Sequence, residues 1–260
     1  MLGAIAGDVI GSVYERRPTK RFDFPLFPSG ARYTDDTVLT VALADGILNE
    51  ADYAETYREY AWTYPNARYG TGFLRWLQNA GGPYNSAWNG SAMRVSPVGI
   101  AFESVERVLA EAERSAVVTH DHPDAIAGAQ AVALAVFMAR AGDGKEAIRA
   151  EISRRFGYDL GRTVDQIRPQ YDFDVTCVGS VPEAIICFLD SHDYESAVRN
   201  AVSLGGDADT QAAIAGGMAE QHYGFVPDSL GRETRQRLPE DFLTVIDAFN
   251  ERYGRPTRSG

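Results

Sequence analysis

Apolar residues recur at helical spacings along almost the whole chain. Residues three or four positions apart share one face of an α-helix, whereas a half-buried strand alternates apolar and polar residues at every second position. The helical spacing is found in runs such as Ile100, Val105 and Leu109; Ile126, Val132 and Val136; Ile185, Ile186 and Leu189; and Phe242, Val245 and Phe249. Sustained period-two runs are not evident. The sequence therefore predicts an all-α protein with many helices.

Turn-forming residues close these runs at positions 65–66, 81–83, 142–144 and 191–193. No linker, low-complexity segment or sustained change of composition divides the chain. Hydrophobic residues make up 45% of the 260 residues and charged residues 23%, which is enough apolar material for one substantial core. We expect a single domain over residues 1–260 and a monomer.

Composition argues against several classes of protein. A formal net charge of −11 disfavours a general nucleic-acid-binding surface, because such binding depends on cations that neutralise phosphates. The longest apolar stretch, residues 125–139, is too short to span a bilayer, which needs about 20 residues, and we expect it to form a buried helix. The first residues lack a basic leader, and Cys177 and Cys187 offer neither a disulfide framework nor a metal-binding spacing. We expect a cytoplasmic protein that binds no membrane.

Two short acidic clusters lie at opposite ends of the chain, each at the start of a helix-like run. The first cluster contains Thr34, Asp35 and Asp36, and the second contains Asp207, Asp209 and Thr210. At the first turn of a helix, neighbouring side chains can still point at one spot. Carboxylate and hydroxyl oxygens are hard ligands that suit Mg²⁺ or Mn²⁺. Together the clusters predict one metal site.

Helix capping is the alternative explanation for both clusters. Thr and Asp are preferred N-cap residues, and acids in the first turn oppose the helix dipole. Either cluster alone is best explained as a cap, but the pair carries more acid than capping needs. Capping and metal ligation can also coexist, because a cap fixes the direction of a carboxylate.

Glycines recur every four residues near the N-terminus, at Gly3, Gly7 and Gly11. On a helix they form a ridge without side chains, which another helix can approach closely. Glu15 falls on the same ridge one turn later, and we interpret it as a carboxylate directed into the site. Asp8 is either a partner of the metal ligands or a solvated residue.

Two segments offer backbone N–H groups to an anion. In the first, Gly179 and Ser180 precede Pro182, a residue suited to the first position of a helix, and such a helix start can bind phosphate. In the second, the turn Asn89-Gly90-Ser91 offers a similar cradle. Most glycine turns bind nothing, so each segment alone is a weak indication.

Aromatic and histidine residues give further candidates. Trp88 and Tyr84 could stack on a base, although a loop aromatic usually packs against the core, and we favour that explanation for each ring. His120 and His122 have a spacing found in zinc sites. The rest of such a site is missing, and His122 resembles the entrance of a helix.

The order of the motifs resembles that of the ADP-ribosylglycohydrolases, the group that contains dinitrogenase-reductase-activating glycohydrolase. The resemblance spans nearly the whole chain and rests on six segments: residues 3–15, 33–37, 89–94, 119–120, 180–185 and 205–210. It implies a compact, orthogonally packed multi-helix domain with a central cleft for two divalent cations, Mg²⁺ or Mn²⁺.

The resemblance also implies an activity, the hydrolysis of the glycosidic bond that joins ADP-ribose to a modified side chain. We favour an arginine linkage, with serine, another linkage or an ADP-ribose-containing small molecule as other substrates. Glu15 and Asp35 are the expected catalytic residues. The expected substrate-binding residues are Trp88, Asn89, Gly90, Ser91, Met93, Arg94, His120, Gly179 and Ser180. Arg94 either contacts the substrate or braces its loop, and a structural hydrogen bond is an equal alternative for His120.

Two other functions stay open from sequence. The chain could be an immunity or binding protein that blocks an ADP-ribosyltransferase by contact, or a two-carboxylate glycosidase without metal. Metal removal distinguishes them, because only the metal-dependent hydrolase would lose its activity.

Overall fold

The computed structural model describes residues 1–79 and 81–254, and within them it contains helices but no sheet. The prediction of an all-α domain is confirmed, with 64% of the structure helical. The helices are α1 (Leu2–Gly11), α2 (Asp35–Leu48), α3 (Tyr53–Thr63), α4 (Thr71–Asn79), α5 (Gly90–Met93), α6 (Ser96–Ala101), α7 (Val105–Ala116), α8 (Pro123–Ala141), α9 (Lys145–Phe156), α10 (Val164–Ile167), α11 (Cys177–Leu189), α12 (Tyr194–Ser203), α13 (Ala208–Tyr223), α14 (Asp228–Arg235) and α15 (Glu240–Tyr253).

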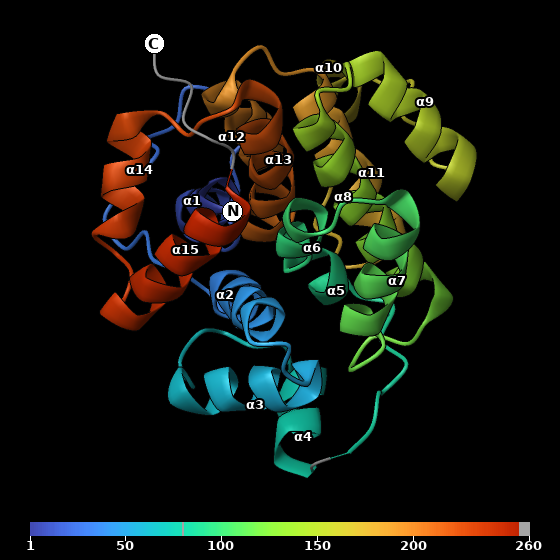
Figure 1. The fold of residues 1–260 in the computed structure, drawn as a ribbon. Coiled ribbons are helices and arrows are strands. Elements are labelled where there is room, and N and C mark those ends of the chain that lie inside the picture. Colours follow the sequence, from blue (N-terminus) through green and yellow to red (C-terminus); the bar gives the residue numbers. More distant parts are fainter. Residues whose placement is uncertain (80, 255–260) are drawn as a thin grey trace.

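Helices α1 and α13, from opposite ends of the chain, cross at the centre of the molecule (Figure 1). The predicted glycine ridge causes this close approach. A Cβ atom on Gly3, Gly7 or Gly11 would overlap backbone oxygens of α13. Because glycine has no Cβ atom, the two helix backbones can touch. The start of α13 therefore lies beside the end of α1. The second acidic cluster occupies that start.

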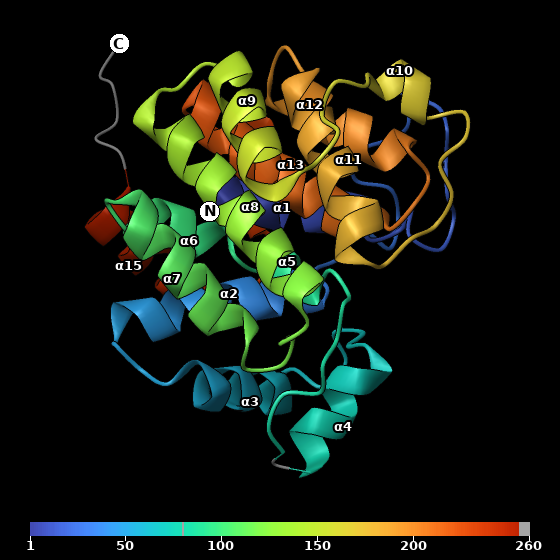
Figure 2. The same cartoon turned by 90° about the vertical axis from the view of Figure 1, so that its right-hand side faces the viewer.

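The remaining helices surround this central pair (Figures 1 and 2). Helices α11 and α12 pack on α13, α14 packs on α1, and α15 packs on α2. Helices α3 and α4 lie at one end of the molecule, and a long connection leads from α4 to α5 (Figure 2). The four predicted loops all fall between helices, as expected from their turn-forming residues.

Helix α8 is long and apolar enough to cross a membrane by length and composition alone. In the structure it packs against α6, α7, α11 and α13 instead. Most of its alanine and valine side chains are buried there. This agrees with the prediction that residues 125–139 form a buried helix.

One helix start differs from the prediction. Helix α11 begins at Cys177, so Pro182 lies inside it and not at its first position. The hydroxyl of Thr176 caps the helix by accepting a hydrogen bond from Gly179 N at 3.1 Å. Asp174 in turn accepts hydrogen bonds from the backbone and hydroxyl of Thr176. The N-cap at Thr176 therefore sets the start of α11, and the helix start predicted from Pro182 is wrong.

Candidate metal and substrate site

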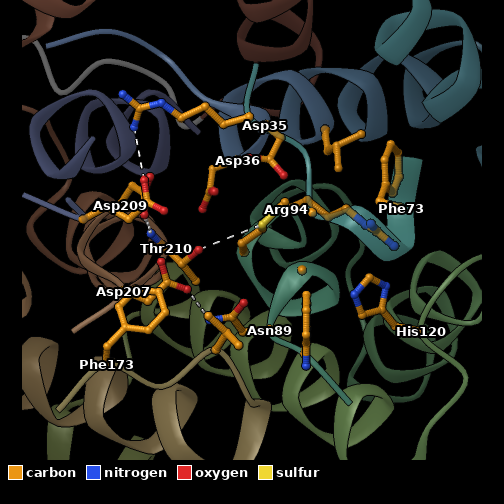
Figure 3. Close-up of a pocket in the computed structure, with 18 of the residues that line it drawn as sticks. Asp35, Asp36, Phe73, Asn89, Arg94, His120, Phe173, Asp207, Asp209 and Thr210 are labelled. Atoms are coloured by element: carbon orange, nitrogen blue, oxygen red, sulfur yellow. Dashed lines mark hydrogen bonds and ion pairs between the residues drawn. The ribbon is translucent and has the colours of Figure 1, made fainter. Parts of the chain in front are cut away.

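The N-terminal ends of α2 and α13 meet at one pocket beside α1. Asp8, Asp36 and Asp209 each place a carboxylate oxygen within 4.8 Å of the others. All three side chains are buried. Figure 3 shows Asp35 and Asp36 on one side of the pocket and Asp207 and Asp209 on another. The two acidic clusters are thus brought together, as the sequence predicted.

Asp8, one member of this cluster, is fully buried. Its carboxylate accepts hydrogen bonds from the backbone N–H groups of Thr34 and Thr37, at 2.9 and 3.1 Å. It also accepts from both threonine hydroxyls, at 2.6 and 2.5 Å. The alternative of a solvated Asp8 is therefore wrong. Asp8 therefore holds the start of α2 in place through these hydrogen bonds.

The first cluster is both a cap and part of the acidic site. Thr34 caps α2 by accepting a hydrogen bond from Asp36 N at 3.3 Å. Asp36 Oδ1, by contrast, is buried and has no hydrogen-bond partner within the described chain. A buried, unpaired carboxylate oxygen is costly unless something binds it. Asp35 is less buried and lines the same pocket.

The second cluster is not a conventional cap. Asp207 is the N-cap residue of α13, yet its side chain makes no capping hydrogen bond. Its carboxylate accepts one from Asn89 Nδ2 at 2.7 Å instead. The same amide donates to Ser180 Oγ at 3.1 Å. The capping explanation therefore fails for Asp207, because its carboxylate is directed by Asn89.

The electrostatics of the cluster favour a bound cation. Burial raises the pKa of Asp35, Asp36 and Asp209 well above the usual value, and repulsion from neighbouring carboxylates raises it further. Burial also raises the pKa of Asp8 and Asp207, although hydrogen bonds from the threonines and from Asn89 oppose the increase. A divalent cation would offset this repulsion. Carboxylate and hydroxyl oxygens fit Mg²⁺ or Mn²⁺ as ligands.

Glu15 also lies in the pocket wall, but outside the regular helix. Helix α1 ends at Gly11, and Glu15 follows in a turn in which its N–H donates to Gly11 O. Its carboxylate forms an ion pair with Arg68, at 3.1 Å between Oε2 and Nη1. Arg68 Nη1 also donates to Ser12 O at 2.8 Å, which ties the loop before α4 to the end of α1.

The outer part of the pocket is lined by aromatic side chains and by the start of α5. Trp88 and Phe173 remain 47% and 55% exposed there, so two rings are available to a ligand. Trp88 therefore does not pack into the core as favoured from the sequence, whereas Tyr84 is half-buried against Gly72 and His120. Phe73 and Phe173 were missed, because an isolated loop or helix aromatic carries no functional pattern.

Arg94 and His120 lie together in the pocket wall (Figure 3). Arg94 is fully buried and donates to Ser115 O and Thr119 Oγ1, so it ties the end of α5 to the end of α7. Its Nε and Nη1 have no hydrogen-bond partner in the described structure. His122 caps α8 by accepting from Asp124 N, as its sequence context indicated. The described residues contain no zinc-like grouping of His120 with His122.

The comparisons with known proteins agree with this geometry. A profile of the family described as ADP-ribosylglycohydrolase matches residues 1–258. The chain belongs to the ADP-ribosylglycohydrolase family. Bovine (Bos taurus) ADP-ribosylhydrolase ARH3 is 27% identical over 96% of this chain and 88% of its own length. ADP-ribosylarginine hydrolase Tri1 of Pseudomonas putida is 26% identical over 86% and 69%. A solved ADP-ribosylglycohydrolase-related protein complex superposes with a TM-score of 0.72 at 26% identity, covering 97% of both chains.

This family consists of hydrolases that act on glycosyl bonds. The family is metal-dependent, and this chain carries a buried acidic triad that could hold a metal ion. Asp8 was not among the ligands expected from sequence. Its position in the glycine-rich first helix, directly after Gly7, was the available indication.

Twelve of the predicted site residues line the pocket: Glu15, Asp35, Asp36, Trp88, Asn89, Gly90, Met93, Arg94, His120, Asp207, Asp209 and Thr210. Thr34 is buried outside the lining and caps α2. Ser91 is buried and donates to Ala125 O, away from the pocket.

The predicted phosphate cradle at Gly179 and Ser180 is wrong, because the cap and first turn of α11 already use both N–H groups. Ser180 instead supports Asn89 by accepting its amide hydrogen bond. It therefore acts on Asp207 through Asn89.

Proposed function

We propose that this protein is a metal-dependent ADP-ribosylhydrolase that cleaves the bond between the distal ribose of ADP-ribose and a modified side chain. The observation that carries the proposal is the buried cluster of Asp8, Asp36 and Asp209, of which Asp36 and Asp209 line a pocket with two exposed aromatic rings. The cluster suits hard cations, and the rings suit a base. Membership of the family supplies the reaction class.

Two divalent ions, Mg²⁺ or Mn²⁺, are proposed to bind at the meeting point of α2 and α13. Their proposed ligands are Thr34, Asp35, Asp36, Asp207, Asp209 and Thr210. When bound, such ions supply Lewis acidity and lower the pKa of water. Asn89 directs the Asp207 carboxylate through its 2.7 Å hydrogen bond, which is the role that outer partners of metal ligands usually have.

Glu15 and Asp35 are the proposed catalytic residues. Both line the pocket, and the charge of Glu15 acts on the Asp35 carboxyl group. Glycosidic hydrolysis passes through an oxocarbenium-like transition state, so it needs one group to remove a proton from water and another to protonate the leaving atom. Arg68 holds the Glu15 carboxylate in place for such a transfer.

The linkage that we propose first is ADP-ribosylarginine. Tri1 of Pseudomonas putida acts on that linkage by its name, whereas the name of bovine ARH3 specifies none. The acidic pocket favours a cationic leaving group such as guanidinium. Serine-linked ADP-ribose is the next substrate to test. We propose that the protein works in the cytoplasm on ADP-ribosylated proteins or on small molecules that contain ADP-ribose.

A panel of ADP-ribosyl linkages tests the function. The purified protein should release ADP-ribose from at least one defined arginine, serine or small-molecule conjugate with Mg²⁺ or Mn²⁺, and chelation should stop the release. Asp35→Asn and Asp209→Asn should abolish turnover and keep the helical circular dichroism spectrum, since each replaces an anionic ligand by an amide of similar shape. Full activity in either variant with unchanged metal content would refute the two-cluster site.

A further inference from the structure

A short relay of hydrogen bonds runs from Arg94 through Thr119 to His120. Arg94 Nη2 donates to Thr119 Oγ1 at 2.9 Å. Thr119 Oγ1 lies 2.6 Å from His120 Nδ1. Arg94 and Thr119 are fully buried, and His120 is only 4% exposed. Water therefore does not compete for these three groups, and their donor and acceptor roles follow from the relay itself.

The direction of each hydrogen bond is determined by the chemistry of its partners. A guanidinium group only donates, so Thr119 Oγ1 accepts from Arg94. The threonine hydroxyl still has one hydrogen to donate, and its only other partner in the described structure is His120 Nδ1. If Nδ1 carried a proton and donated, the buried hydroxyl hydrogen would have no acceptor. Nδ1 is therefore the acceptor.

A neutral imidazole that accepts at Nδ1 carries its proton on Nε2. Burial, and next the charge of Arg94, lower the pKa of His120 well below the usual range, so the ring stays neutral. The groups that face it are Arg94, the Tyr84 ring at 5.5 Å and the backbone of Gly90. The histidine thus cannot gain a second proton easily.

The Nε2 atom faces the pocket at Gly90. A Cβ atom at position 90 would lie 2.9 Å from Nε2, so the glycine leaves this side of the nitrogen open. Both residues line the pocket, and Nε2 has no hydrogen-bond partner in the part of the chain that the structure describes. Its N–H is therefore available to a ligand.

We propose that Arg94 and Thr119 are positioning residues that fix His120 in its Nε2–H tautomer, so that His120 is a neutral hydrogen-bond donor to an oxygen of bound ADP-ribose. The identity of the ligand rests on the proposed function. The tautomer does not, because it follows from the protein alone. Arg94 is thus placed to act on the ligand through the two hydrogen bonds of the relay.

The tautomer can be measured by long-range ¹H–¹⁵N correlation spectra of the full chain with ¹⁵N-labelled histidine. The chain has four histidines, and loss of one signal set in His120→Gln assigns the relevant ring. We expect a protonated Nε2 and an unprotonated Nδ1. In Thr119→Val, which keeps the shape but loses the hydroxyl, the Nδ1–H form should become populated; Thr119→Ser should keep the wild-type pattern.

ADP-ribose titration by calorimetry tests the consequence. Affinity should fall about five- to tenfold in Thr119→Val, as expected for loss of one hydrogen bond, and be retained in Thr119→Ser. A protonated Nδ1 in the wild-type protein, or an unchanged tautomer and affinity in Thr119→Val, would overturn the relay. If the wild-type spectra match the expectation but ADP-ribose does not bind, the proposed function fails and the relay stands.

Discussion

Removal of metal should make the stability of this protein unusually sensitive to pH. Asp35, Asp36, Asp207 and Asp209 line the pocket, and Asp8 places a carboxylate oxygen within 4.8 Å of Asp36 and Asp209. Burial is the main cause that raises the pKa of each of them. Without a cation, the folded protein therefore holds protons at pH values where the unfolded chain has already released them.

The sign of the effect follows from this difference. The contribution of these groups to stability is fully present below the unfolded pKa, near the ordinary value of 3.8. It is lost as the pH rises through the raised pKa values of the folded protein. Each unit by which the pKa in the folded protein exceeds that in the unfolded chain corresponds to about 1.4 kcal/mol of unfolding free energy. The metal-free protein should therefore be more stable at pH 5 than at pH 8.

Metal binding should reverse the loss at neutral and alkaline pH. An ion at 100 times its dissociation constant stabilises the folded state by about 2.7 kcal/mol. For a chain of this size, that corresponds to an increase in melting temperature of about 5–10 °C. The increase should shrink toward pH 5, because protons then compete with the metal for the same carboxylates.

Asp36→Asn separates electrostatic repulsion from other causes of the loss of stability at high pH. The substitution removes one buried charge whose Oδ1 has no partner in the described structure. In the absence of metal at pH 8, the variant should melt at a higher temperature than the wild type, yet gain little from added Mg²⁺. The exposed Glu59, replaced by glutamine, is the control for loss of one negative charge elsewhere.

Differential scanning calorimetry with chelator or with Mg²⁺, at pH 5 and pH 8, provides the measurement. The reasoning would be refuted by a Mg²⁺-induced shift of equal size at both pH values. It would also be refuted if metal-free Asp36→Asn were no more stable than Glu59→Gln at pH 8.

Three further predictions concern single residues. Asn89→Ala should weaken Mn²⁺ binding about 10- to 100-fold in a calorimetric titration, because Asp207 loses its directing donor; an unchanged affinity would contradict that role. Glu15→Gln should slow single-turnover hydrolysis by about 10²- to 10⁴-fold and leave ADP-ribose affinity nearly intact, and a normal rate would reject its catalytic role. Gly7→Ala should lower the unfolding free energy by about 1–3 kcal/mol in urea, whereas Gly144→Ala, with open space around its Cβ, should change it little.

The fold class could be predicted because helical periodicity repeats in nearly every segment. The meeting of the acidic clusters could also be predicted, since Thr34–Asp36 and Asp207–Thr210 share an unusual chemistry at helix starts. Sequence signals for a helix start were less reliable where two of them indicated different residues. At α11, both Thr176 and Pro182 mark a helix start, and the outcome depended on Asp174 supporting the threonine cap.

The aromatic wall of the pocket could not be predicted in the same way. Phe173 and Trp88 come from loops whose relative position depends on the isolated bridge between Trp88 and Thr176. Arg68 escaped notice because its role depends on a contact with Glu15, 53 residues earlier. Contacts between distant loops leave no periodic pattern in the sequence.

The glycine ridge connects the fold to the chemistry of the site. Gly7 and Gly11 bring the α1 backbone against α13, and Asp8 lies between them on the same helix. The distance between α1 and α13 therefore determines how far Asp8 lies from Asp209 at the start of α13. Asp8 also holds the start of α2 through Thr34 and Thr37. One helix without side chains on its contact face thus fixes the positions of both acidic clusters, and a larger side chain there would displace the carboxylates as well as strain the core.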